Sequence, residues 1–195
     1  MSDFLSAFRP ALVLVALFTL LLGVGYPLAI LGIGQAVFPH QANGSLIVED
    51  GKIIGSERVG QAFASPRYFN TRPSAAGKGY DANASSGSNL GPTSKALAER
   101  ITTDIAAQRK AGVIGDVPAD LVTASASGLD PDLSPAAALV QVPRIARERG
   151  LGEAAVRTLV ERSVEQPVLG ILGEPHVNVL TLNRQLDRMQ PSSRP

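Results

Sequence analysis

The sequence has no cysteine and no tryptophan, and aromatic residues make up only 5% of it. The absence of cysteine excludes disulfides, thiolate nucleophiles and Cys-ligated zinc, and it is compatible with either side of a membrane. The shortage of aromatic side chains argues against a surface on which nucleic-acid bases stack. The formal net charge is +1, so the chain has no bulk attraction for nucleic acid or anionic lipid. At 195 residues it is long enough to bury one real core.

Motifs for catalysis and nucleotide binding are also missing. The chain has no G-x-x-x-x-G-K-[ST] phosphate loop and no G-x-S-x-G nucleophile elbow. His40 and His176 are the only histidines, too few for a zinc site with suitable ligand spacing. Asp130 and Asp132 carry the right oxygens for a divalent ion, but they are more simply turn and helix-entry residues. The sequence therefore predicts no catalytic residues, no metal and no intrinsic cofactor.

Charged side chains are absent from Pro10 to Val48. A bilayer core needs about 20 apolar residues in a helix, so we expect a transmembrane helix over residues 10–34 after a short cytoplasmic segment, residues 1–9. The alternative is a cleaved signal peptide, whose apolar region is usually only about 7–15 residues long. Arg9 precedes the span and no Lys or Arg follows it before Lys52, which favours a cytoplasmic N-terminus and an extracytoplasmic domain.

Small residues and proline crowd the second half of this span. Glycine and proline weaken a helix, but small side chains let two helices approach closely in lipid. Transmembrane helices also carry such residues without any partner. We favour the first interpretation and predict that Gly25 and Ala29 pack against a helix of a partner subunit.

The rest of the chain mixes strand and helix patterns without a regular βαβ repeat. Residues 35–190 therefore predict one α+β domain, followed by a flexible tail over residues 191–195. Asp50-Gly51 between two apolar runs predicts a β-hairpin with a type I′ turn. The expected elements after it are a helix over 93–112, a strand beginning near 120, a helix over 134–150 kinked at Pro143, a helix over 153–165, and a strand leading into a helix over 176–189.

Between the hairpin and the first of these helices, residues 63–92 form a long run of turn-forming residues with scattered aromatics. Such a segment is usually either functional or disordered, and the aromatics argue against disorder. Within it, "YDANASSGSNLGPTS" at residues 80–94 is either a spacer or a loop whose backbone forms a binding surface.

Four stretches carry a resemblance to a known family: "YFNTRPSA" (68–75), "SSGSNLGPTS" (85–94), "VTASASGLDPDLSP" (122–135) and "VNVLTLN" (177–183). In this order, and together with the N-terminal span, they resemble the C subunit of the bacterial Kdp potassium-transporting P-type ATPase. The resemblance covers essentially the whole chain. It implies a single-pass protein of the bacterial inner membrane that works with three partners: a channel-like potassium-binding subunit, a P-type ATP-hydrolysing subunit and a small membrane subunit.

The resemblance implies two possible roles for such a subunit, neither of them hydrolytic. One is assembly and coupling of the channel-like and ATP-hydrolysing subunits. The alternative is a catalytic chaperone that raises the ATP affinity of the pump subunit through a transient ternary complex with ATP. A glutamine is the proposed nucleotide contact in the family, and Gln141 is the candidate here.

For the first role, the irregular loop supplies a plausible docking surface. Gly87 permits unusual backbone angles, and short polar side chains around it offer donors and acceptors at little entropic cost. Larger side chains nearby would act as the anchors typical of protein interfaces. The residues predicted to contact a partner subunit are Tyr68, Phe69, Arg72, Ser85, Ser86, Gly87, Ser88 and Asn89.

Overall fold

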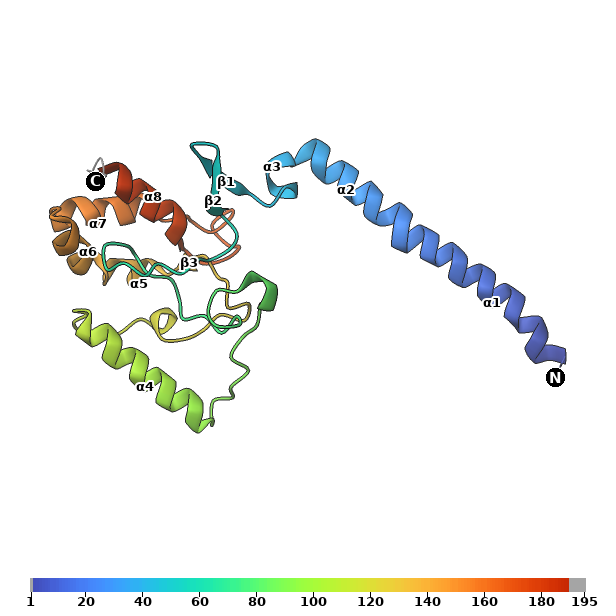
Figure 1. Cartoon of the computed structure of the whole chain (residues 1–195), viewed down its shortest axis with the longest axis horizontal. Coiled ribbons are helices and arrows are strands. Elements are labelled where there is room, and N and C mark those ends of the chain that lie inside the picture. The colour runs from blue at the N-terminus through green and yellow to red at the C-terminus, as the bar shows by residue number, and fades with distance from the viewer. Residues whose placement is uncertain (1, 190–195) are drawn as a thin grey trace. The chain divides into compact units, whose positions relative to one another are not determined.

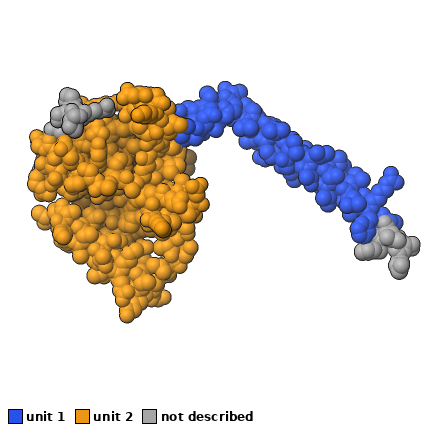
Figure 2. Space-filling model, in the orientation of Figure 1, with its two compact units in different colours: residues 1–46 blue, residues 47–195 orange. Residues whose placement is uncertain are grey.

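A computed structural model of the chain describes residues 2–189 (Figure 1). The predicted tail over residues 191–195 lies outside the described residues. The chain divides into two compact units, residues 1–46 and 47–195 (Figure 2). The fold mixes helices with short strands, as the patterns predict.

The first unit is a long apolar helix followed by one short helical turn. It consists of α1 (Ser2–Leu20), a π-helical segment η1 (Leu21–Gly25), α2 (Tyr26–Val37) and α3 (Pro39–Ala42). Residues Ser6–Val37 are long and apolar enough to cross a membrane, with a mean hydropathy of 2.3 over an 18-residue window, and form the one such helix among the described residues. This candidate span contains the predicted one and is longer at both ends.

The π-helical segment has a local cause in the sequence. Pro27 has no backbone N–H and therefore cannot donate the usual helical hydrogen bond to the carbonyl of Gly23. One turn earlier the helix widens, so that the N–H of Tyr26 donates to the carbonyl oxygen of Leu21, five residues back. The helix thus continues through a proline and two glycines, with an altered surface where the small residues gather.

Within residues 2–189, ten further elements follow the hairpin strand β1 (Leu46–Glu49). In chain order they are β2 (Lys52–Ser56), η2 (Ala82–Ala84), α4 (Lys95–Lys110), η3 (Ala119–Leu121), β3 (Asp132–Leu133), α5 (Pro135–Leu139), α6 (Val142–Arg149), α7 (Glu153–Arg162), β4 (Val177–Asn178) and α8 (Val179–Met189). β1 pairs with β2, and β3 pairs antiparallel with β4.

Local signals in the sequence explain most of these boundaries. Asp50 and Gly51 have φ angles of 49° and 75°, which confirms the predicted type I′ turn between β1 and β2. The Ser94 hydroxyl accepts the N–H of Leu97 and caps α4. The helix predicted over 134–150 is interrupted more strongly than by the kink expected at Pro143: α5 stops at Leu139 and α6 begins at Val142, so two helices replace one.

The prediction of a strand beginning near residue 120 is wrong. Residues Ala119–Leu121 form a 3-10 turn, followed by irregular backbone. Side chains here bond to the backbone instead of leaving it free for a sheet. The Thr123 hydroxyl donates to the Ala119 carbonyl at 2.7 Å, and the Asp120 carboxylate accepts the N–H of Ser134 at 2.7 Å.

The core of the second unit lies between α5, α6, α7 and α8. These helices gather on one side of the unit, while α4 lies at its other edge (Figure 1) and has no buried residue. Residues from the β3–β4 pair and from the irregular segment before α4 complete the core. The largest fully buried side chains include Phe69, Leu121, Leu133, Ile145, Leu182 and Leu186.

Phe69 has none of its surface exposed, so the prediction that it is a surface anchor for a partner is wrong. We expect Phe69→Ala to lower the free energy of unfolding by about 3–5 kcal/mol, because it removes a large buried side chain and leaves a cavity. Denaturant unfolding of the full chain in detergent, followed by circular dichroism, measures this change.

The matched control is Ile114→Ala, since the Ile114 side chain is 91% exposed. A surface substitution of this kind should stay within about 0.5 kcal/mol. Equal effects of the two substitutions would contradict the core position of Phe69.

Candidate functional site

Two side-chain amides hold the irregular segment at residues 69 and 70. Asn183 Oδ1 accepts the N–H of Phe69 at 2.8 Å, and its Nδ2 donates to the Phe69 carbonyl at 3.0 Å. Gln141 does the same for Asn70, accepting its N–H at 2.9 Å and donating to its carbonyl at 3.1 Å. Each amide therefore takes the place of a neighbouring β-strand and pairs both backbone groups of one residue.

The positions of these amides follow from the helices that carry them. Gln141 lies in the break between α5 and α6, and Asn183 lies on the buried face of α8. Each residue is only 2% exposed. Buried amides without partners cost stability, so pairing with the segment satisfies the amide and the backbone together.

Gln141 makes two more hydrogen bonds. Its Nε2 also donates to the Ala137 carbonyl at 3.1 Å, and its Oε1 also accepts from Arg144 Nη2 at 2.7 Å. A glutamine amide offers two donor hydrogens and two acceptor lone pairs, so these four bonds use all of them. The nucleotide contact suggested for Gln141 stays a prediction, and in this conformation a nucleotide would have to replace one of these bonds.

Two arginines of α6 also donate hydrogen bonds to the same segment. Arg144 Nη1 donates to the carbonyls of Pro66 and Tyr68, the latter at 3.0 Å, and burial lowers the pKa of Arg144. Arg149 Nε donates to the Arg67 carbonyl at 2.7 Å, and its guanidinium lies 4.7 Å from the centre of the Tyr68 ring. Sequence reasoning missed both residues, because basic side chains in a helix are usually exposed.

Tyr68 is tied to α8 as well as to Arg149. Its hydroxyl donates to Asp187 Oδ2 at 3.1 Å, and Arg149 Nη2 lies 2.8 Å from Asp187 Oδ1. Tyr68 is partly buried, so only part of this predicted anchor is accessible to a partner.

Arg72 links the segment to the loop after η3. Its Nη1 lies 3.1 Å from Asp130 Oδ2, and its Nε donates to the Thr123 carbonyl at 3.3 Å. Asp130 also accepts the N–H of Asp132 at 3.1 Å, as a turn residue does. Arg72 is partly buried and its contact with a partner stays a prediction.

The loop at residues 85–89 packs on the loop at residues 125–128. The N–H of Ser86 and the hydroxyl of Ser85 both donate to the Ser127 carbonyl, at 3.0 and 2.9 Å. A Cβ atom on Gly87 would lie 3.0 Å from the Ala126 carbonyl oxygen, so glycine allows this close approach. Asn89 has a φ of 52°, which asparagine tolerates better than most residues. The loop is therefore an ordered part of the fold.

We define the three-loop surface as residues 68–75, 80–94 and 122–130. Ser74 joins the first and third of these loops through its hydroxyl, which donates to the Gly128 carbonyl at 2.6 Å. Ser85 and Asn89 are exposed on this surface, and Ser86, Gly87 and Ser88 are partly buried. The structure brings most of the predicted contact residues together here, while Gly25 and Ala29 belong to the separate helical unit.

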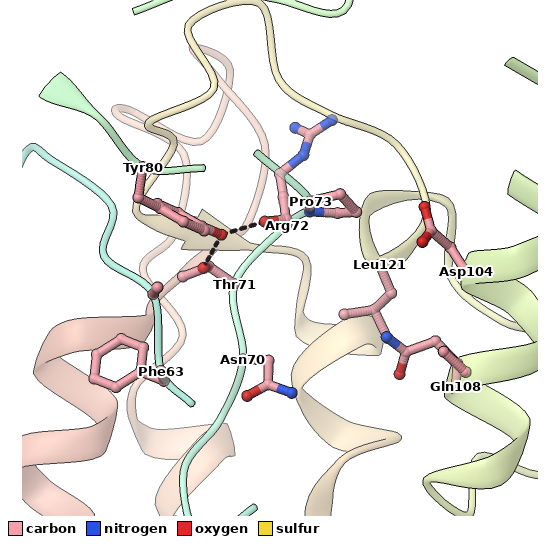
Figure 3. A pocket seen from close by; sticks show the side chains of 11 residues that line it. Phe63, Asn70, Thr71, Arg72, Pro73, Tyr80, Asp104, Gln108 and Leu121 are labelled. Carbon is pink, nitrogen blue, oxygen red and sulfur yellow. Dashed lines mark hydrogen bonds between the residues drawn. The ribbon is translucent and has the colours of Figure 1, made fainter. Parts of the chain in front are cut away.

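A pocket of about 300 Å³ lies beside this surface, between the irregular segment and α4 (Figure 3). Tyr80 closes one wall, with its hydroxyl bonded to Thr71 and to the Arg72 carbonyl. Asn70 Oδ1 and Asp104 Oδ2 are buried without a hydrogen-bond partner among residues 2–189. Burial raises the pKa of Asp104, and the nearby Arg100 opposes the shift. The pocket is therefore small and polar, and few charged side chains line it.

A second, larger pocket of about 580 Å³ has an acidic lining. Asp120, Asp130, Asp132 and Glu174 line it. Burial raises the pKa of Asp132, and His176 and Asn178 oppose that shift. Most of these carboxylates are already bonded within the fold, and the described part of the chain holds no group of three or more His, Asp or Glu residues placed to bind a metal ion.

Comparison with known proteins gives one consistent result. The family model described as "K+-transporting ATPase, c chain" (KdpC) matches residues 8–188. A Potassium-transporting ATPase KdpC subunit of Caulobacter vibrioides is 57% identical over 188 residues, covering 96% of this chain and 95% of the relative. The proteins of the same name from Acidobacterium capsulatum and Rhodopseudomonas palustris strain CGA009 are 52% and 48% identical, covering 93% and 94% of this chain and 97% of each relative.

We expect Gln141→Ala to lower the free energy of unfolding by about 3 kcal/mol or more. The substitution leaves the N–H and carbonyl of Asn70 and the guanidinium of Arg144 without their buried partner. Denaturant unfolding of the full chain in detergent measures the change.

Gln166→Ala is the matched control, because Gln166 is exposed and should tolerate the change. A Gln141→Ala protein as stable as the control would show that the amide is free for another ligand.

The loop at residues 85–89 allows a test that keeps its backbone shape. The combined variant Ser85→Ala, Ser86→Ala, Ser88→Ala and Asn89→Gly retains Gly87 and the positive φ at position 89. We expect its melting temperature to fall by only a few degrees, since two side-chain hydrogen bonds are lost, from Ser85 to the Ser127 carbonyl and from Ser86 to the Gly87 carbonyl. If the loop contacts a partner subunit, recovery of the assembled complex should fall much further.

Thr102→Ala with Thr103→Ala is the control, because these exposed hydroxyls bond only to the backbone of their own helix in the described contacts. Full recovery and activity of a complex carrying the loop variant would make the loop a structural spacer.

Proposed function

Because this chain belongs to the KdpC family of K+-transporting ATPase c chains, we propose that it is a non-catalytic subunit of an ATP-driven potassium uptake complex. The observation that carries the proposal is the match over residues 8–188, which includes most of the apolar helix and the second unit as far as residue 188. The family predicted from four short stretches is thereby confirmed. The relatives are named as subunits, so partner subunits are part of the proposal.

The proposed role is to assemble and couple a channel-like potassium-binding subunit and a P-type ATP-hydrolysing subunit, with a small membrane subunit as a third partner. An assembly role needs surfaces of fixed shape, since ordering a flexible surface on binding reduces affinity. Two features support it. The buried amides of Gln141 and Asn183 fix the irregular segment, and the three-loop surface is held by bonds between its loops.

The proposed location is the bacterial inner membrane, with a single span, a cytoplasmic N-terminus and an extracytoplasmic second unit. The candidate span at Ser6–Val37 supports membrane attachment. Arg9 near the start of the span and the absence of Lys or Arg before Lys52 support the orientation. This orientation would place the second unit away from cytoplasmic ATP, which weighs against direct nucleotide binding.

The alternative role, raising the ATP affinity of the pump subunit, requires a different kind of site. It needs a group that contacts nucleotide, and the side chain suggested for this, Gln141, has all four hydrogen-bonding positions occupied. We therefore keep ATP as a ligand of the complex and not of this chain.

The function is tested by removing the chain from its complex. Deletion should abolish ATP-driven potassium uptake and prevent the remaining subunits from being purified together, and the full-length chain supplied in trans should restore both. A complex that assembles without the chain but has a higher KM for ATP would replace the assembly role with the chaperone role.

Within this experiment, Gly25→Leu should reduce recovery of the complex while membrane insertion stays intact, because leucine prevents close approach of a second helix. Val24→Leu is the control, since position 24 already carries a large apolar side chain and is exposed in the described chain. Unchanged recovery with Gly25→Leu would mean that the helix tolerates the small residues without using them.

A further inference from the structure

The tip of a hairpin between α7 and β4 exposes four large aliphatic side chains. Val168, Leu169, Ile171 and Leu172 are 65%, 85%, 79% and 60% exposed. Exposed apolar residues are common singly, but a contiguous group of this size usually marks an interaction site. We call residues 167–173 the apolar tip.

The hairpin that carries the apolar tip is held by its own hydrogen bonds. At its base Glu165 and His176 exchange backbone bonds of 2.8 and 3.1 Å. Near the tip Val168 and Leu172 exchange two bonds of 3.0 Å. Because the backbone is paired internally, the tip can enter an apolar environment without leaving these groups unsatisfied.

The turn itself places an apolar residue where the backbone does not favour one. Leu169 has a φ of 55° and Gly170 a φ of 74°, the pair of left-handed angles that Asn-Gly or Asp-Gly adopts most easily. A leucine at such a position is unusual, and such outliers concentrate at functional sites. The polar residues preferred in this turn would also have avoided exposing apolar surface.

We propose that the apolar tip inserts into an apolar groove with a positively charged rim on another subunit of the potassium-transporting ATPase complex. The proposal rests on the proposed function, which supplies the partner subunits. The rim is inferred from charge: Glu165 and Glu174 flank the tip, and residues 163–176 contain no Lys or Arg. Basic groups on the partner would complement this arrangement.

The composition of the hairpin favours a protein groove over lipid. Loops and helices that bind a bilayer surface use Trp, Tyr, Lys or Arg at the headgroup level, and residues 163–176 have none of these. The two glutamates would in addition be repelled by anionic lipid.

Site-specific photocrosslinking in the full complex tests where the apolar tip lies. The photoreactive residue p-benzoylphenylalanine is placed at position 169 and, as control, at position 114, where the isoleucine is 91% exposed outside the hairpin. We expect a crosslink from position 169 to another subunit of the complex. Position 114 should give no crosslink to the site on that subunit that position 169 labels. Crosslinks from position 169 to lipid alone, or to nothing, would overturn the proposal.

Two variants test the chemistry of the contact. Leu169→Ser with Ile171→Ser should lower recovery of the complex about tenfold, whereas Ile114→Ser should leave it unchanged. Glu174→Lys should lower recovery at low salt, and added salt should restore part of the loss because it screens the repulsion from a basic rim. Each variant is checked by thermal unfolding of the free full-length chain, which these exposed substitutions should not change.

Normal recovery of the complex with the serine variant would overturn the docking proposal. Normal recovery with Glu174→Lys at low salt would overturn the inference that the partner's groove has a basic rim. If the unmodified chain fails to join the complex at all, the proposed function fails instead. The two failures are therefore distinguishable.

Discussion

The second unit depends on the pairing of two buried amides with an irregular stretch of backbone. Gln141 and Asn183 each exchange two hydrogen bonds with one residue of the stretch, at Asn70 and Phe69. A strand in a sheet obtains these bonds from a neighbouring backbone, and here helices supply them through side chains. The burial of Phe69 follows from this pairing, because a buried phenylalanine requires its own N–H and carbonyl to be satisfied.

The same pairing connects the helical core to the three-loop surface. Arg72 lies two residues after Asn70 and bonds to Asp130 and Thr123, and Ser74 bonds to Gly128. The break that Pro143 imposes between α5 and α6 matters for the same reason, since Gln141 lies in that break. A loop surface without regular secondary structure can then keep one shape.

Three exposed features suit contact with other proteins, and they differ in chemistry. The helical unit offers small residues beside a π-helical turn, within a span with no buried residue. The three-loop surface is polar and held by hydroxyl and backbone bonds, and the apolar tip is aliphatic with acidic flanks. Lipid and water favour different contacts, so the three features suit different kinds of partner surface.

The sequence alone determined the features that arise within a few residues. The apolar span, the Asp50-Gly51 turn and a disturbance of the helix at Pro143 could all be predicted, because apolar composition, turn angles and the missing proline N–H are local properties. The burial of Phe69, the bonding of Gln141 and the pairing of β3 with β4 could not. Their partners are far away in sequence, 71 residues for Asn70 with Gln141 and 114 for Phe69 with Asn183. Only the packing of the helices against the irregular segment brings these groups within hydrogen-bonding distance, so only the tertiary structure decided which polar side chains are buried and which are exposed.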